Sequence, residues 1–126
     1  MNKIAAIQSF FSQFLPAYEE NAIYSQKAQP TFPYITYEGV DDSFGDLDTQ
    51  ITFSTWYREG SWVNAVNKAS EISRAIPRPG LMLPCDEGYV LIRKGSSPFG
   101  QRMGDDSDDL IKRTVFKLNI RSYTND

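Results

Sequence analysis

The sequence contains no histidine and only one cysteine, Cys85. Without histidine, the chain cannot form the serine–histidine or cysteine–histidine pairs of nucleophilic enzymes, nor a zinc site with imidazole ligands. A single cysteine cannot form a disulfide within the chain, and Cys85 is best interpreted as a small apolar residue that follows a turn proline. Common routes to catalysis are therefore closed, and we expect a protein that is not an enzyme.

Clusters of positive charge and long apolar runs are missing as well. Thirteen lysines and arginines against sixteen acidic residues give a net charge of −3, and the cations form no run. Proteins that grip DNA neutralise several phosphates with clustered cations, so this pattern disfavours direct DNA binding. No apolar stretch reaches the ~20 residues of a membrane helix, and no signal-peptide pattern is present. We expect no membrane partner and synthesis in a cytoplasm-like compartment.

What the sequence does contain is an ordinary share of apolar residues, 40%, with a high aromatic share of 13%. Its 126 residues suffice for one domain with a single core. An apolar stripe at helical spacing predicts a helix over 2–14 that is capped by Asn2. The stripe consists of Ile4, Ile7, Phe11 and Phe14. Residues 18–30 are polar and are expected to form a connector, with a helical turn around 19–24.

The clearest predicted strand covers 47–57. Alternation divides its side chains between two faces, one buried and the other mostly exposed to water. The first face holds Ile51, Phe53, Thr55 and Tyr57, and the second holds Gln50, Thr52, Ser54 and Trp56. A large aromatic residue on the wetter face makes Trp56 an interface candidate. An earlier strand is predicted over 32–38, where aromatic and β-branched residues gather.

The second half of the chain predicts a helix followed by three strands. The helix covers 61–76, with Ser61 as its N-cap. The strands cover 81–83, 88–94 and 111–123. Residues 95–109 hold three glycines and four aspartates and are expected to form a long loop. The order helix, two strands, helix, three strands predicts an α+β fold, a mostly antiparallel β-sheet with two helices packed on one face.

Two acidic clusters are candidate metal sites. The first consists of Asp41, Asp42, Asp46 and Asp48, and the second of Asp105, Asp106, Asp108 and Asp109. The first departs from a calcium loop, because its twelfth position is Thr52 rather than glutamate. Charge clusters in glycine-rich loops are more often solvated turns, and the sequence has no phosphate loop or nucleophile elbow. We expect no metal and no cofactor, and a metal-dependent hydrolase that uses these aspartates is kept as a remote alternative.

Four segments together resemble a known family. They are Pro30-Thr-Phe-Pro-Tyr-Ile-Thr-Tyr-Glu38, the Thr55-Trp-Tyr57 end of the long strand, the helix over 61–76, and the final strand Lys112-Arg-Thr-Val-Phe-Lys-Leu-Asn-Ile-Arg121. In this order they look like the tail-terminator proteins of siphophages, also called tail-completion or minor capsid proteins. The resemblance spans most of the chain and rests on element order and short motifs rather than on a catalytic signature.

The resemblance implies that residues 1–126 form a single tail-terminator-like domain. Such proteins build a hexameric ring in the virion, at the head-proximal end of the tail, after synthesis in the host cytoplasm. The implied partners are further copies of the chain, the tail tube protein and a head-completion or connector protein. DNA only passes through the central channel, without specific binding. Another head–tail connector or a tail-tube component of the same particle stays open as an alternative.

Candidate contact residues follow from this expectation. Aromatic side chains are enriched at interfaces, so the candidate anchors in a ring or tube interface are Phe44, Trp56, Tyr57 and Phe99. A ring of net negative subunits lets DNA slide, whereas cations would hold it. We therefore expect the loop over 95–109 to turn its aspartates, Asp105, Asp106, Asp108 and Asp109, toward the lumen or to remain mobile until assembly. The alternatives are that Tyr57 and Phe44 simply close the core and that the loop is only solvated.

Overall fold

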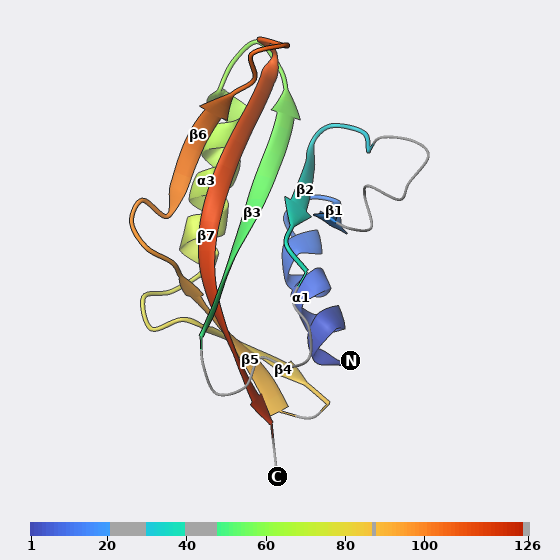
Figure 1. The fold of residues 1–126 in the computed structure, drawn as a ribbon, viewed down its shortest axis with the longest axis vertical. Coiled ribbons are helices and arrows are strands. Elements are labelled where there is room, and N and C mark those ends of the chain that lie inside the picture. The colour runs from blue at the N-terminus through green and yellow to red at the C-terminus, as the bar shows by residue number, and fades with distance from the viewer. Residues whose placement is uncertain (21–29, 40–47, 87, 125–126) are drawn as a thin grey trace.

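The computed structural model describes residues 1–20, 30–39, 48–86 and 88–124. The helices in these ranges are α1 (Lys3–Ser12) and α3 (Val63–Ala75). The strands are β1 (Ala17–Glu19), β2 (Tyr34–Tyr37), β3 (Thr49–Arg58), β4 (Leu81–Cys85), β5 (Gly88–Lys94), β6 (Gly100–Gly104) and β7 (Ile111–Thr124). Both helices lie on the same side of a curled, mostly antiparallel sheet (Figure 1), which confirms the predicted α+β fold.

The long strand β7 is the centre of the sheet. The strand order is β1-β2-β3-β7-β5-β4, and β6 pairs with β7 outside this path. On one side β7 pairs with β3 from Ile111 to Ile120. On its other side, β6 pairs with the first half of β7 and β5 with the second half. Because both edges of β7 are used, the strands on either side are joined through it.

The predicted loop over 95–109 is wrong in its middle, where β6 pairs with β7. Between β5 and β6 the chain leaves β7 only over 95–99, as a bulge opposite Lys117. There Gly95 donates its N–H to the carbonyl of Lys117 at 2.8 Å, and Lys117 donates its N–H to the carbonyl of Phe99 at 3.0 Å. All residues of β6 are exposed, so no buried face produces the apolar alternation by which a strand is recognised.

A further strand, β1, lies where the connector over 18–30 was expected to begin. It runs parallel to β2, with Ala17 opposite Ile35, and Ile35 donates its N–H to the carbonyl of Pro16 at 2.8 Å. Three residues are too few to show a period of two, which explains why the pattern did not reveal this strand. The helical turn predicted around 19–24 lies mostly outside the described residues.

The other strand predictions are confirmed with shifted bounds. β2 is shorter than the predicted 32–38 and lies between two neighbours, β1 and β3. β3 ends at Arg58, and β5 has the predicted bounds. β4 continues beyond the predicted 81–83 to Cys85 and includes Pro84. Proline is tolerated there because β4 is the last strand in the sheet order, where one side of the strand needs no donor.

Helix α1 begins as predicted, since the side chain of Asn2 accepts the N–H of Ala5 at 2.7 Å. Its buried face differs from the predicted stripe. Ile4 is 47% exposed, whereas Phe10 is buried beside Ile7. The buried side of the helix is centred on its second and third turns, so Ile4 lies at the margin of that side.

Helix α3 begins at Val63, two residues after the predicted N-cap Ser61. The Ser61 hydroxyl still accepts the N–H of Val63 at 3.1 Å, so the serine serves the predicted purpose from just outside the helix. Ile72 is buried as predicted, and Ala65 is buried in addition. The small Ala65 side chain allows the first turn of the helix to approach the sheet closely.

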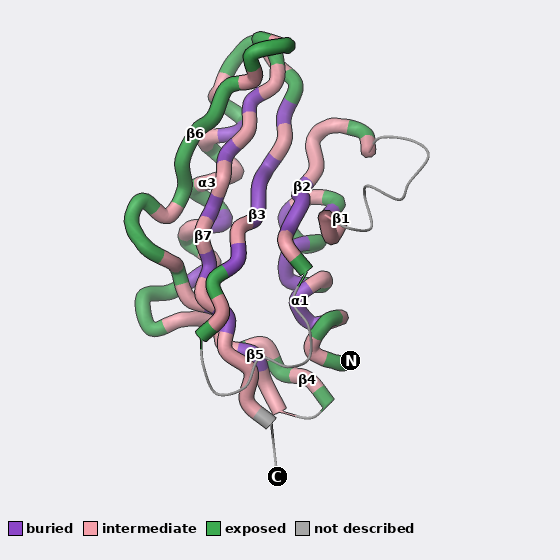
Figure 2. The backbone as a smooth tube through the Cα atoms, in the orientation of Figure 1, coloured by how far each residue is buried: buried purple, intermediate pink, exposed green. Residues whose placement is uncertain are grey.

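The core lies between the helices and the strands β2, β3, β5 and β7, and it shows as purple stretches along the backbone in Figure 2. Phe53 and Phe116 face each other across β3 and β7, with stacked rings 4.6 Å apart. From α1, the ring of Phe11 lies 4.9 Å from that of Phe53. These residues all occupy the side of the sheet on which α1 and α3 lie, and neither of these two described helices covers the other side.

Candidate interaction surface

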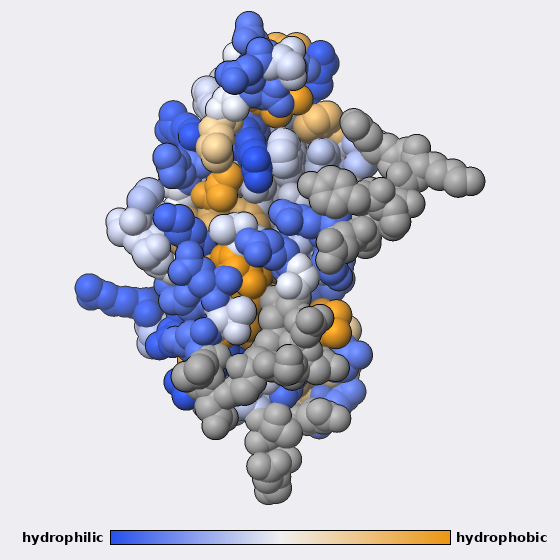
Figure 3. Space-filling view, in the orientation of Figure 1, coloured by the Kyte–Doolittle hydropathy of each residue, from blue (hydrophilic) through white to orange (hydrophobic). Residues whose placement is uncertain are grey.

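The outer face of the sheet, turned away from both helices, carries the residues that alternate with the core. On this face Trp56 lies opposite Arg113 on β7 and opposite Tyr34 on β2. Figure 3 views the molecule from this side and shows a mostly hydrophilic surface with small apolar patches. The structure thus confirms that Trp56 lies on the wetter face, where its side chain is half-buried.

Trp56 belongs to an aromatic cluster, which we define as Tyr18, Phe32, Tyr34 and Trp56. The rings of Tyr34 and Trp56 are stacked with centroids 6.1 Å apart, and Tyr34 also contacts Phe32 at 5.2 Å and Tyr18 at 6.2 Å. All four side chains are half-buried. Burial raises the pKa of Tyr34, partly opposed by the nearby Arg113 guanidinium. The cluster is a preformed aromatic surface that remains partly open to solvent.

Two polar contacts fix the position of the tryptophan in this cluster. Its indole Nε1 donates a hydrogen bond to Thr36 Oγ1 at 2.8 Å. The Arg113 guanidinium lies over the Trp56 ring at 4.5 Å from its centroid and donates from Nε to Ser54 Oγ at 3.1 Å. A cation stacked on indole is a favourable arrangement, worth about 0.5–1 kcal/mol at exposed sites. The ring is therefore held in place before any partner arrives.

Positive charges line β7 on the same face, in what we call the cationic track: Arg113, Lys117 and Arg121. They recur every fourth residue, so alternation brings all three to one side of the strand. No carboxylate forms an ion pair with any of them within the described ranges. The absence of a cation run in the sequence therefore did not exclude a cationic surface. The spacing in β7 was the signal that could have revealed it.

The other predicted anchors lie elsewhere. Tyr57 is only 5% exposed and points to the helix side, where burial raises its pKa together with the charges of Glu59 and Glu71. Phe99 is half-buried and packs its ring 5.3 Å from that of Phe116. Both side chains thus serve the core of the subunit, as the alternative interpretation of Tyr57 proposed. Phe44 lies outside the described residues.

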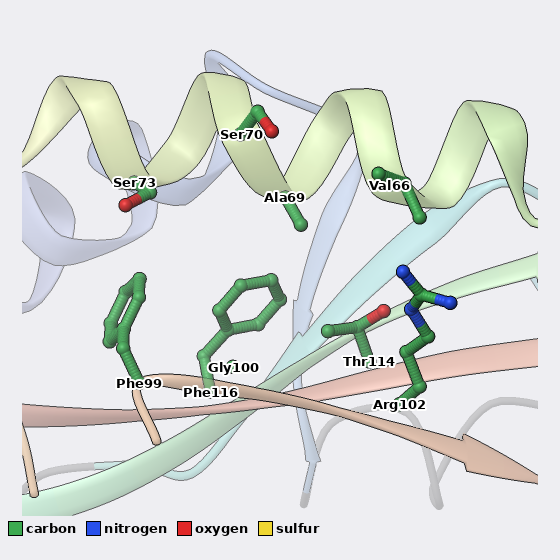
Figure 4. Close-up of a pocket in the computed structure, with 9 residues that line it drawn as sticks. All are labelled: Val66, Ala69, Ser70, Ser73, Phe99, Gly100, Arg102, Thr114 and Phe116. Atoms are coloured by element: carbon green, nitrogen blue, oxygen red, sulfur yellow. The ribbon is translucent and has the colours of Figure 1, made fainter. Parts of the chain in front are cut away.

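Phe99 also lines a groove between α3 and the strands β6 and β7 (Figure 4). The groove has a volume of about 300 Å³ and combines apolar side chains such as Val66 and Phe116 with Ser70 and Arg102. Figure 4 shows the Phe99 and Phe116 rings below α3, with Arg102 reaching toward the same space from β6. The residues that line it include no carboxylate, and the hydroxyl of one of them, Ser73, accepts a hydrogen bond from Lys94 Nζ at 2.8 Å.

The second acidic cluster forms an ordered turn, the acidic tip (residues 105–110), between β6 and β7. Asp105 Oδ1 accepts the N–H of Ser107 at 2.8 Å and its hydroxyl at 2.6 Å. Asp108 accepts the N–H of Leu110 at 2.9 Å and pairs with Arg58 Nε at 3.0 Å. These bonds hold the pKa of both carboxyl groups below the ordinary value, through Ser107 for Asp105 and through Leu110 and then Arg58 for Asp108.

The acidic clusters do not form a metal site in the described part of the chain. No group of three or more histidine, cysteine, aspartate or glutamate side chains is placed to hold an ion there. Asp48, from the first cluster, forms an ion pair with Arg93, and the other three members of that cluster lie outside the described ranges.

Among the helices that the structure describes, none is long and apolar enough to cross a membrane.

Acidification is expected to loosen the acidic tip. The pKa values of Asp105 and Asp108 are lowered by folding, so their contribution to stability is fully present above the ordinary value of 3.8. That contribution is lost as the pH falls through the lower values of the folded state. The amide resonances of Ser107 and Leu110, followed by NMR during acid titration, should move below pH 3.8. Amide shifts that stay constant through this range would contradict the assignment.

Comparisons of the chain with protein-family models, with curated proteins and with solved structures found no match.

Proposed function

We propose that the protein is a structural component of a bacteriophage virion, a tail terminator of the siphophage type. The observation that carries the proposal is the outer face, where the aromatic cluster and the cationic track lie side by side on the side of the sheet that faces away from α1 and α3. Trp, Tyr and Arg are the residue types that most often anchor protein–protein interfaces. A preformed surface of this composition suits docking to other proteins.

A ring of identical subunits needs two different surfaces on each copy, because each subunit meets one neighbour with one side and the next with another. The outer face supplies one of them. The sheet also presents strand edges: β1 and β4 lie at the two ends of the strand order, and β6 lies outside that order beside β7. In the described part of the chain each of these strands pairs on one side only. Unpaired strand edges are ready templates for contact with another chain.

The proposed ring is hexameric and sits on the last layer of the tail tube. One side of the ring contacts the tail tube protein and stops its polymerisation, and the other side receives the head-completion or connector protein. DNA passes through the central channel without specific binding. A subunit with a net charge of −3 supports this arrangement, because a net negative ring repels the phosphate backbone.

A head–tail connector or a tail-tube component would use the same kinds of surface. Stoichiometry separates these roles, since a tube protein polymerises without limit whereas a terminator forms one ring per tail. We do not propose a hydrolase, because Asp48 and Asp108 are each engaged by an arginine rather than directed together toward a cleft.

Removal of the protein from the phage tests the proposal. Electron microscopy of lysates should show overlong tails without heads, because tube growth is no longer stopped. Tails of normal length joined to heads would contradict the proposal. Supply of the wild-type protein in trans should restore normal tails, which controls for effects on neighbouring genes.

The outer face is tested in the same complementation experiment with the variant Trp56→Ala. Loss of the indole removes the ring that both Tyr34 and Arg113 contact, so we expect at least a tenfold fall in complete particles, the effect of about 1.4 kcal/mol at an interface anchor. Trp62→Ala is the matched control, because Trp62 lies on the helix side, near Arg102 and Lys112. Circular dichroism establishes that both variants are folded. Equal complementation by the two variants would remove the outer face from the interface.

A further inference from the structure

The cationic track and the acidic tip are complementary surfaces at different places on one subunit. The track lies along β7 on the outer face, and the tip joins β6 to β7 at the end of the sheet (Figure 1). We infer that the acidic tip of one copy docks on the cationic track of the next copy. This inference rests on the proposed function and deepens it, because it names the two surfaces through which successive subunits of the ring meet.

In the described part of the chain, no carboxylate neutralises the positive charges of the track. Two other cations of the outer face are already neutralised within the subunit, Arg58 by Asp108 and Arg93 by Asp48. Within the described ranges no carboxylate pairs with Lys117, Arg121 or Arg113. The Arg121 guanidinium lies over the Tyr123 ring, 5.4 Å from its centroid, and that of Arg113 contacts the Trp56 ring and the Ser54 hydroxyl. Cations without a carboxylate partner, beside half-buried aromatic rings, attract a surface that carries carboxylates.

The acidic tip carries such carboxylates on a turn that its own hydrogen bonds hold in one conformation. Asp105 and Asp108 are used inside the turn, whereas Asp106 and Asp109 are exposed and their side chains form no ion pair within the described residues. Leu110, beside them, is 38% exposed. An ordered turn that presents two free carboxylates and an apolar side chain can dock without first becoming ordered, which lowers the entropic cost of association.

The tip cannot reach most of the track on its own chain. β7 begins directly after the tip, and a strand rises about 3.3 Å per residue, so Lys117 lies roughly 20 Å and Arg121 roughly 33 Å along the strand from Ile111. A contact between tip and track therefore joins two molecules. Because the two surfaces differ, the contact is heterologous, the type of contact that builds a ring when its rotation closes.

A second copy fits the track better than nucleic acid does. The chain has more acidic than basic residues, so copies would repel one another unless the opposite charges were arranged to meet. The three cations of the track are also separated by about 13 Å along the strand, which leaves room for the aspartates of a tip between them.

Charge reversal tests the inference. The track variant is Lys117→Glu with Arg121→Glu, and the tip variant is Asp106→Lys with Asp109→Lys. The matched control, Arg74→Glu with Arg78→Glu, changes the net charge as much as the track variant does but leaves the track, the tip and β6 intact. Oligomer mass is measured by light scattering and sedimentation at about 10 mM salt, where the Debye length is about 30 Å and charge contacts are strongest. Circular dichroism checks that each variant is folded.

Each reversed variant alone should associate at least about tenfold more weakly than wild type, because like charges then face each other. A one-to-one mixture of the two variants should recover association, in assemblies where the two chains alternate. A single chain that carries all four reversals should also associate. The control variant should behave as wild type.

The inference would be overturned by a wild-type chain that stays monomeric under these conditions, by a track variant that associates normally, or by a mixture that fails to recover. Nucleic acid is examined with a fluorescent single-stranded oligonucleotide. If the wild-type protein binds the oligonucleotide and the track variant does not, while self-association is unchanged, the track is assigned to nucleic acid and the inference is overturned.

If deletion of the protein gives overlong tails but the reversed variants complement the deletion, the inference fails and the proposed function stands. If charge pairing holds but deletion leaves tails normal, the proposed function fails alone.

Discussion

Replacement of Phe116 by alanine is expected to lower the free energy of unfolding by about 3–5 kcal/mol. The side chain is 1% exposed at the centre of β7, and its ring contacts those of Phe53 at 4.6 Å and Phe99 at 5.3 Å. Truncation leaves a cavity between α3 and the sheet that its rigid neighbours cannot fill. Since small domains are stable by only about 5–15 kcal/mol, the variant should be marginally folded.

Val115→Ala is the matched control, because Val115 is the next residue of the same strand and faces the other side. Its side chain is half-buried, so its truncation should cost about 1 kcal/mol or less. Urea denaturation followed by tryptophan fluorescence gives both values. Equal losses for the two variants would mean that the assignment of helix side and outer face along β7 is incorrect.

Gly95→Ala is expected to destabilise the protein by about 1–3 kcal/mol. An added Cβ would lie 2.8 Å from the Cβ of Lys117 and 2.9 Å from its carbonyl carbon. The obstacle is largely backbone, so it cannot move away as a flexible side chain would. The bulge over 95–99 would have to shift, and with it the bond from the Gly95 N–H to the Lys117 carbonyl.

Gly104→Ala provides the comparison, because a Cβ added at Gly104 meets no atom of the described residues within 4 Å beyond its own chain neighbours. Its effect should stay within about 0.5 kcal/mol, as for ordinary surface positions. The same denaturation experiment measures both glycine variants, and amide hydrogen exchange in β6 should rise only in Gly95→Ala. Wild-type stability in Gly95→Ala would show that the chain leaves β7 at a different residue.

The sequence predicted those elements in which the pattern of apolar and polar side chains shows which face is buried. β3 and β7 were recognisable because one face of each strand is apolar over many residues, and Asn2 marked the start of α1 through its capping side chain. β6 could not be found in this way, because none of its side chains enters the core. Ile4 was misplaced because an apolar residue at the margin of a helical stripe has the same spacing as one inside it.

The surface was predicted only in part, for a related reason. Alternation along β3 placed Trp56 on the wetter face, but its partners depend on strand register, which the sequence does not specify at these positions. Tyr34 and Arg113 meet Trp56 only because β2 and β7 align with β3 as they do. Tyr57 and Phe99 were chosen for their residue type, and the structure places both against the core.

The central position of β7 has a consequence for how the protein is made. β7 follows the other described strands along the chain, yet β3, β5 and β6 all depend on it for pairing. While the ribosome is still synthesising residues 111–124, those three strands lack this partner. The sheet therefore closes in a late step that joins distant segments, and such steps are slow. The outer face, where Trp56 meets Arg113 of β7, is therefore complete only after β7 has emerged from the ribosome.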